Sequence, residues 1–394
     1  MPGSVILGGA RTPIGKLSGA VSTLSAVQLG SIAIAEALSR AGLAGEEVDY
    51  VVMGQVLQAG AGQGTARQAA AGAGVPLGTP AATINKVCLS GLNAIHLADL
   101  MVRAGEARVV VAGGMESMSS APHLLPGARG GLRLGGAQIV DAISSDGLTC
   151  AFESRSMGEA TDDYAAKAGI SRDRQDAVAA ASHERASAAT KAGVLAEEIV
   201  PVHAPRRRGE SELVENDEGI LPGTTIETLA RLRSAFSPTG TITAGNASQI
   251  SDGAAAVVVC STETAEQLGR TPLAEIVSYG QVAGPDPSLL TQPSRAVRAA
   301  LERAAIPLSA VDLFELNEAF AAVVCASLDD LGISQASCNP NGGAIALGHP
   351  IGMSGARLAL TLAYELRRRG GGTGVVALCG GGGQGDAMVV RTLA

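Results

Sequence analysis

Two segments of this chain, SGLNAIHLADLMVRAG (90–105) and SGARLALTLAYELRRRG (354–370), share a helical pattern that opens with Ser-Gly. Three further pairs of segments match in the same order: EALSRAGL with AALERAAI, VDYVVMG with VDLFELN, and VVVAGG with VVALCGG. The residue numbers within the four pairs differ by 263 to 266. Several matches in one order at a nearly constant offset indicate an internal duplication, so we predict two homologous halves.

Short strand-like runs alternate with helical patterns along the chain, which predicts an α/β fold. The strand-like runs cover 48–54, 107–114, 254–260 and 373–379. The helical patterns cover 25–40, 91–103, 171–192, 293–304 and 354–369.

The duplication also divides the chain. We predict an N-terminal half made of residues 1–118 and 250–270, and a C-terminal half made of residues 271–394. Residues 119–249 differ in composition, since they hold the Gly-rich PHLLPGARGGLRLGG and the acidic ELVENDEG. We interpret them as an inserted loop domain, because long excursions from a rigid scaffold commonly carry binding functions.

Composition limits the class of protein. Of 394 residues, 46% are apolar and 17% charged, as in a compact globular protein, and the net charge of -8 gives no reason to expect nucleic acid as a partner. The six cysteines have no metal-ligand spacing, so we expect free thiols and no metal. The N-terminus does not resemble a signal peptide and no apolar run is long enough to span a bilayer. We therefore expect a cytoplasmic protein without membrane contact.

Cys88 stands immediately before the first repeated helix. The positive end of a helix dipole and the unpaired backbone N–H groups there favour a thiolate. The residue that matches it in the second half is Gly352, so the turn itself does not require a cysteine. A reactive thiol and a small buried apolar residue both fit this position.

His349 lies between Gly348 and Pro350, on a loop that enters the second repeated helix. His96 and His183 instead fall inside helical patterns, and we predict structural or surface roles for them. A histidine held on such a loop can activate a nearby thiol as a nucleophile.

Cys379 opens the run CGGGGQG, which is followed by the strand-like DAMVVRTLA. A phosphate-binding loop would lead into a helix, and no lysine follows Lys191, so we predict a hairpin between two strands. The matching residue in the first half is Gly113. A merely flexible connection is the alternative, but it would not explain the cysteine.

Asn317 and Glu318 directly follow a predicted strand. Polar side chains at the carboxyl end of a strand face the crevice where α/β proteins bind ligands. Capping of the next helix is an equally good interpretation of Asn317.

Taken together, these loops resemble the thiolase family over the whole chain. The matching motifs, in family order, are ARTPIGK (10–16), VCLSG (87–91), VVAGGMESMS (110–119), GNASQISDGAAA (245–256), NEAFA (317–321), GGAIALGHPIGMSGAR (342–357) and CGGGGQG (379–385). The resemblance implies a five-layered αβαβα arrangement of two related halves and a loop domain over the pantetheine of coenzyme A. It also implies a homotetramer built as a dimer of dimers.

Within the family the chain is most similar to the acetyl-CoA acetyltransferase type. That type condenses two acetyl-CoA to acetoacetyl-CoA and CoA, reversibly, through an acylated cysteine. The resemblance makes Cys88 the nucleophile, His349 its base and Cys379 the second catalytic cysteine, which moves the Cα proton. It also implies that Asn317 orders an oxyanion-hole water and that the N–H groups of Cys88 and Gly381 form a second oxyanion hole.

The resemblance also implies a substrate channel, with Ser248 contacting CoA. The residues expected to line the acyl or pantetheine channel are Leu148, Met157, Phe236, Ala319 and Phe320. CoA thioesters serve as substrates and products, and no further cofactor is expected. The chain departs from the family pattern at Ser156, where a histidine is common, and at Gly380 and Gln384.

Three other functions compete with this interpretation. A 3-ketoacyl-CoA thiolase of broader chain length, acting in fatty-acid β-oxidation, would carry the same motifs. The terminal motif at Cys379 argues against a decarboxylating ketosynthase or a hydroxymethylglutaryl-type synthase. A non-catalytic CoA-binding protein would not need Cys88, His349, Cys379 and Asn317 together.

Overall fold

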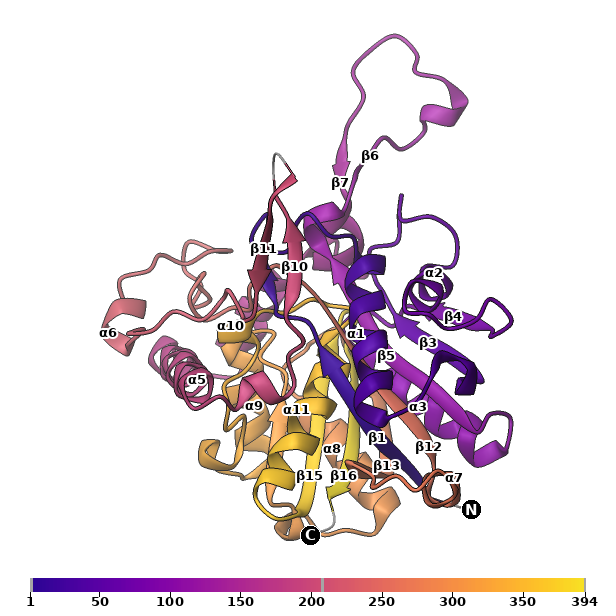
Figure 1. Ribbon diagram of the computed structural model, residues 1–394. Coiled ribbons are helices and arrows are strands. Elements are labelled where there is room, and N and C mark those ends of the chain that lie inside the picture. Colours follow the sequence, from indigo (N-terminus) through magenta and orange to yellow (C-terminus); the bar gives the residue numbers. More distant parts are fainter. Residues whose placement is uncertain (1–2, 207–208, 393–394) are drawn as a thin grey trace.

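The computed structural model describes residues 3–206 and 209–392 (Figure 1). Its largest sheet in these residues has ten strands, nine of them in the order β14-β15-β16-β13-β1-β12-β5-β3-β4, while β2 pairs with β12 at one side. The strands are β1 (Ser4–Arg11), β2 (Gly15–Lys16), β3 (Tyr50–Gly54), β4 (Ala81–Ile84), β5 (Val109–Ser117), β12 (Ser251–Ser261), β13 (Ala274–Ala283), β14 (Leu313–Leu316), β15 (Gly372–Gly380) and β16 (Gln384–Thr392).

The sheet consists of two matching halves. Outward from the central pair, β1 is antiparallel to β12, β12 is antiparallel to β5, and β5 is parallel to β3. In the same way, β13 is antiparallel to β16, β16 to β15, and β15 is parallel to β14. β1 and β13 share only three residue pairs, at Ser4, Val5 and Ile6. The predicted duplication of an α/β unit is confirmed.

The repeated helices, α3 (Ser90–Ala104) and α11 (Ser354–Arg368), pack against each other and contact strands of both halves. A Cβ atom on Gly91 would lie 2.8 Å from the backbone nitrogen of Ala356, and one on Gly355 would lie 2.4 Å from that of Leu92. Only glycine permits so close an approach, which explains why both repeats open with Ser-Gly.

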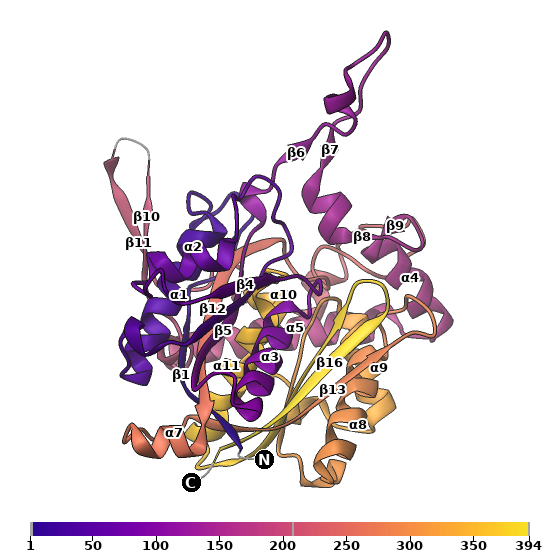
Figure 2. The same cartoon turned by 90° about the vertical axis from the view of Figure 1, so that its right-hand side faces the viewer.

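Further helices cover the outer faces of the two half-sheets, giving five layers (Figures 1 and 2). On the N-terminal half these are α1 (Ala26–Ala41) and α2 (Thr65–Gly72), and on the C-terminal half α8 (Gln292–Ala304) and α9 (Ala321–Leu331). The five helices predicted from the sequence are all present as α1, α3, α5, α8 and α11, with ends shifted by at most one residue.

Burial follows these layers. Along β12, Val257 and Val259 pack in the middle layer, while Val258 and Cys260 pack on the outer face with α1. The strand is therefore buried on both faces, as its continuous apolar sequence requires. The segment Val87–Ala104, which by length and composition could cross a membrane, includes α3 and owes its apolar character to this middle layer.

The glycine run after Cys379 forms the turn between β15 and β16. Cys379 pairs with Gly385 across this antiparallel hairpin, and the backbone of Gly382 and Gly383 is left-handed, with φ of 80° and 73°. The predicted hairpin is confirmed, and the described residues that follow the turn form strand β16 rather than a helix.

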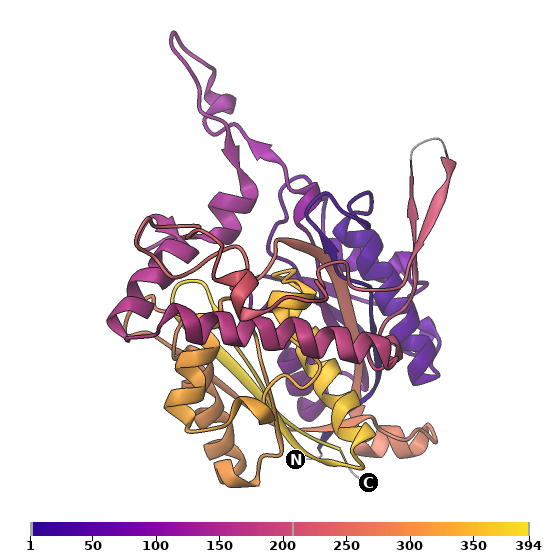
Figure 3. The ribbon, with the colours of Figure 1, turned by 90° about the vertical axis from the view of Figure 1, so that its left-hand side faces the viewer.

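Residues 119–249 connect β5 with β12. Two arms project from the body, one based on β6 and β7 and one formed by β10 and β11 (Figures 1 and 2). Helix α5 contacts α9 and α10, and Figure 3 shows it lying across the C-terminal half. The remaining strands and α-helices are β6 (His123–Leu124), β7 (Val140–Asp141), β8 (Thr149–Cys150), β9 (Arg155–Ser156), β10 (Val202–Pro205), β11 (Ser211–Val214), α4 (Met157–Lys167), α5 (Arg172–Lys191), α6 (Ile226–Leu229), α7 (Thr262–Gln267) and α10 (Ala344–Leu347).

Candidate active site

The predicted catalytic residues meet where the two halves adjoin. Cys88 precedes α3, His349 precedes α11, and Cys379 and Gly381 belong to the β15–β16 hairpin. All four line a single inner cavity of about 50 Å³. The fold thus joins a loop of the N-terminal half to two loops of the C-terminal half.

The predicted channel residues surround the same space. The inner cavity is also lined by Leu148, Met157, Ser248, Ala319 and Phe320. It adjoins an outer cavity of about 440 Å³, because both are lined by Leu148, Met157, Ser248, Phe320, His349 and Ile351, and Phe236 lines the outer one. The sequence did not point to Gly147, Leu289 and Ile351, which complete the inner wall.

The Cys88 thiol is protonated at neutral pH. Burial raises its pKa to about 11, and the nearby backbone N–H groups of Gly381 and Cys88 lower it by less. The N–H group at the helix terminus does favour the thiolate, as the sequence predicts, but its effect on the pKa is smaller than that of burial. The reason is that losing hydration outweighs the local dipoles.

Cys379 is also a thiol, with 1% of its surface exposed. Burial raises the pKa of this thiol well above its usual value, and the neighbouring Cys88 raises it further. Neither cysteine can lose its proton unless an acceptor stands nearby.

His349 is held by Ser354, the first residue of α11. The Ser354 hydroxyl donates to the carbonyl of Pro350 at 2.9 Å, so at 2.6 Å from His349 Nδ1 it accepts the ring N–H. This assigns the proton to Nδ1 and leaves the lone pair on Nε2. Burial, together with the charge of Arg357, lowers the pKa of His349 to about 3, so the ring is a neutral base.

Asn317 lies beside that base. Its Nδ2 is 3.4 Å from His349 Nε2, and its backbone N–H donates to Ala377 at 2.9 Å. Helix α9 begins at Ala321 with Phe320 as its N-cap, so the alternative role of Asn317 as a helix cap is wrong. Asn317 Oδ1 is buried and accepts no hydrogen bond from the described residues.

The neighbouring Glu318 holds the loop that leads to His349. Its carboxylate accepts hydrogen bonds from Ser182 on α5 at 2.6 Å, Asn339 at 2.9 Å and the backbone of Ile345 at 3.1 Å. Glu318 therefore joins the loop domain to the C-terminal half behind the site.

Two aromatic rings form part of the channel wall. Phe236 and Phe320 meet edge to face, with centroids 6.1 Å apart. A Cβ on Gly158 would lie 2.4 Å from the Phe236 ring, so the glycine after Met157 makes room for it. The backbone N–H of Ser248 donates to Ala319 at 3.0 Å, which closes the wall.

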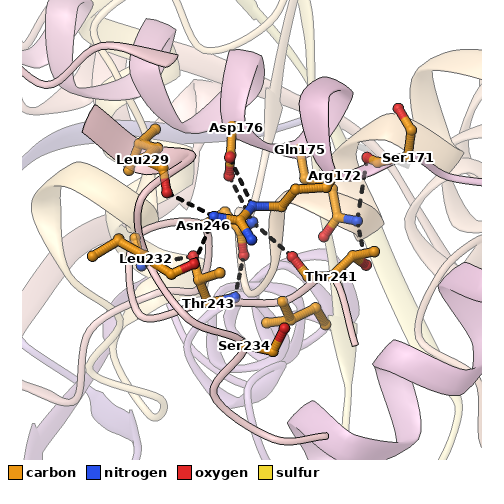
Figure 4. A network of polar contacts seen from close by, with 12 residues as sticks. Ser171, Arg172, Gln175, Asp176, Leu229, Leu232, Ser234, Thr241, Thr243 and Asn246 are labelled. Atoms are coloured by element: carbon orange, nitrogen blue, oxygen red, sulfur yellow. Dashed lines mark hydrogen bonds and ion pairs between the residues drawn. The ribbon is translucent and has the colours of Figure 1, made fainter. Parts of the chain in front are cut away.

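A polar network fixes this wall from behind (Figure 4). Asp176 on α5 accepts from Arg172 at 2.7 Å and from Asn246 at 2.9 Å. The Asn246 carbonyl accepts from Ala321 at 2.9 Å, and Arg172 donates to Leu229 at 2.6 Å. Asp176 thus anchors the segment that carries Ser248 and Phe236.

The departures from the family pattern have structural explanations at two positions. Ser156 is the N-cap of α4, where its hydroxyl accepts from Glu159 at 3.1 Å, and it lines the outer cavity. A Cβ on Gly380 would lie 2.7 Å from the Leu89 side chain, which explains a glycine at this position beside Cys379. Nothing in the structure explains Gln384.

Two supporting residues escaped the sequence analysis. Ser354 had a signal: it matches Ser90, whose hydroxyl donates to Val87 at 2.6 Å and so supports the Cys88 turn. Glu116 gave none. It accepts from the backbones of Val56 and Gly352, both at 3.0 Å, and burial raises its pKa to about 7. Within the described residues, no three His, Cys, Asp or Glu side chains are grouped as metal ligands.

Comparisons with known proteins agree with this geometry. Residues 4–263 match the thiolase N-terminal domain and residues 270–392 match the thiolase C-terminal domain. The chain belongs to the thiolase family, as the sequence motifs had predicted, and it has the thiolase fold.

Individual relatives are similar over nearly their whole length. A probable acetyl-CoA acetyltransferase of Mycolicibacterium smegmatis is 54% identical over 98% of this chain and 100% of its own. An acetyl-CoA acetyltransferase of Pseudomonas aeruginosa is 48% identical over 98% of both chains. The crystal structure of the Bacillus anthracis acetyl-CoA acetyltransferase superposes with a TM-score of 0.97 at 38% identity, covering 100% of this chain and 99% of that one.

The neutral state of His349 can be tested through the pH dependence of stability. In the folded protein the ring titrates near pH 3, against 6.5 when unfolded, so between these values only the unfolded state takes up the proton. The contribution of His349 to the free energy of unfolding is complete above pH 6.5. Below that pH it falls by about 1.4 kcal/mol per pH unit. Urea unfolding should show that the free energy of unfolding of the wild type falls by about 2 kcal/mol more than that of His349→Gln when the pH is lowered from 6.5 to 5.

His96 and His183, whose pKa values burial also lowers to about 4, are present in both proteins and cancel in the difference. If the free energy of unfolding fell equally in the two proteins, the conclusion that His349 is neutral and buried would be contradicted.

Proposed function

We propose that this chain is an acetyl-CoA C-acetyltransferase, which condenses two acetyl-CoA to acetoacetyl-CoA and CoA and also catalyses the reverse thiolysis. The observation that carries the proposal is the meeting of Cys88, Cys379, His349 and the Gly381 N–H in one small cavity at the end of a larger one. The names of the similar proteins support the same activity.

In the first step, Cys88 Sγ forms a bond with the carbonyl carbon of acetyl-CoA. Its pKa of about 11 means that the thiol must give up its proton as it attacks, and the Nε2 lone pair of His349 is the acceptor. The N–H groups of Cys88 and Gly381 stabilise the oxyanion. The bond to the CoA sulfur then breaks, and the Cys379 thiol protonates the departing CoA.

The second step uses the thiolate that this leaves on Cys379. It removes a Cα proton from a second acetyl-CoA, and the resulting carbanion attacks the acetyl carbonyl on Cys88. The acetyl–sulfur bond breaks, His349 returns its proton to Cys88, and acetoacetyl-CoA leaves. Each group ends in its starting state, so the cycle needs no co-reactant beyond CoA thioesters.

Asn317 contributes to the enolate site of the second step. Its buried Oδ1 has no donor among the described protein groups, and its amide lies 3.4 Å from His349 Nε2. A water between Asn317 and the substrate oxygen would satisfy both polar groups.

The small inner cavity favours a short acyl group. Leu289, Met157 and Phe320 close it around Cys88, and its volume is about 50 Å³. A hydrophobic pocket changes kcat/KM by about 10- to 200-fold for each methylene added or removed. In thiolysis assays with CoA we expect ping-pong kinetics and a kcat/KM at least about tenfold higher for acetoacetyl-CoA than for 3-ketohexanoyl-CoA.

A control series with 3-ketooctanoyl-CoA and longer substrates separates the alternatives. A kcat/KM that stays level or rises with chain length would replace the proposal with a broad-range 3-ketoacyl-CoA thiolase. No thiolysis of any substrate would contradict both.

We also propose a homotetramer, for which the arm beyond β6 and β7 provides the support. This arm exposes Leu132 (62%) and Leu134 (108%) in its loop and Ile139 (64%) next to β7, and exposed apolar groups of this kind commonly mark protein contacts. Light scattering should give four chains of 39.2 kDa, and Leu134→Ser should weaken the assembly. A wild-type monomer or dimer would contradict the proposal.

A further inference from the structure

The turn that presents Cys88 has an unfavourable backbone conformation. Val87 has a φ of 51°, and a β-branched residue in this left-handed region is a clear exception. Such a strained conformation persists only where the surroundings hold it. The position of the Cys88 sulfur therefore depends on the groups that fix this turn.

Some of these groups belong to the turn and to its own helix. Asn85 Oδ1 accepts from the backbone of Val87 at 2.9 Å. The Ser90 hydroxyl donates to the Val87 carbonyl at 2.6 Å and accepts from the backbone of Lys86 at 2.8 Å. These bonds hold the turn on α3, but they do not connect it with the hairpin that carries Cys379 and Gly381.

The side chain of Lys86 makes that connection. Its ammonium lies 2.8 and 2.9 Å from the two carboxylate oxygens of Asp386 and donates to Gln281 at 3.2 Å. Asp386 is on β16 and pairs with Leu378, directly beside the Cys379–Gly385 pair. One ion pair thus spans the nucleophile turn of one half and the hairpin of the other.

The Asp386 carboxylate is itself held rigidly. It is fully buried, and the Tyr279 hydroxyl hydrogen-bonds to it. Tyr279 in turn accepts from Asn93 at 3.2 Å, and its ring stacks on His96 with centroids 3.8 Å apart. The Lys86 ammonium therefore meets an immobile partner, and the chain cannot shift the turn without leaving a charge buried and unpaired.

We propose that Lys86 and Asp386 are positioning residues for the reaction. Their ion pair holds the Val87–Cys88 turn against the β15–β16 hairpin, so that the Cys88 sulfur stays at the Gly381 N–H and near Cys379. This role rests on the proposed function, in which Cys88 is the acyl acceptor. The second half offers no counterpart, because Pro350 occupies the position that matches Lys86.

The test compares Lys86→Met and Asp386→Asn with a matched control, Arg103→Met. Arg103 is on α3, the helix that follows the Lys86–Cys88 turn, and forms an ion pair with Asp99 at 2.6 Å. Its side chain is as exposed as that of Lys86 (22% and 21%), and it too reaches β13, donating to Ile276 at 2.8 Å. It lies at the opposite end of the helix from Cys88, so loss of its ion pair should affect stability alone.

The measurement is the rate of acetyl adduct formation on Cys88 by acetyl-CoA, followed by rapid quench and mass spectrometry well below each melting temperature. Lys86→Met and Asp386→Asn should be slower by about 10- to 100-fold, the effect of moving a reacting group by about 1 Å. Arg103→Met should stay within about twofold of the wild type, and Lys86→Arg should recover most of the rate because it keeps the charge.

Each outcome has a separate meaning. Wild-type rates in Lys86→Met, or an equal loss in Arg103→Met, would overturn the positioning role. If Lys86→Met does not fold, Asp386→Asn, which keeps the shape and one acceptor oxygen, decides on the same criterion. A wild-type protein that forms no adduct would instead contradict the proposed function.

Discussion

The close packing of α3 against α11 determines how the two halves of the protein come together. Gly91 and Gly355 let the two helices approach until the backbone of one meets the Cα of the other. Each helix begins beside a site loop, so this contact brings the Cys88 turn to the His349 loop. The serine next to each glycine then fixes its own loop, Ser90 through Val87 and Ser354 through His349. One duplicated feature thus builds two different halves of a single site.

The electrostatics of the site follow from its burial. The cavity is closed enough to keep Cys88, Cys379 and His349 neutral in the free protein, since burial disfavours every charged form. A buried thiolate would be costly to maintain. In the proposed cycle, charge develops only while a thioester is present and while the backbone N–H of Gly381 can share it. The catalytic groups are fixed in place before that moment, so little reorganisation accompanies the reaction.

Much of this arrangement could be predicted from the sequence because it is encoded locally. The duplication gave the two halves, and the divergence of matched positions singled out Cys88 and Cys379, which replace glycines of the other half. Three features could not be predicted. The pKa of Cys88 depends on burial by segments far away in the chain, the contacts of Glu116 are all with backbone groups, and the ion pair between Lys86 and Asp386 joins residues 300 positions apart. Helix and strand patterns report local preferences, whereas these contacts exist only in the folded chain.

In the proposed cycle the two cysteines divide the work, with Cys88 carrying the acyl group and Cys379 the proton. The most direct measurement combines mass spectrometry after acetyl-CoA treatment with exchange of the acetyl-CoA methyl protons in D₂O, for the wild type and Cys379→Ala. We expect an acetyl group on Cys88 in both proteins and proton exchange in the wild type alone. Exchange at the wild-type rate in Cys379→Ala, or an adduct on any residue other than Cys88, would contradict this division of work.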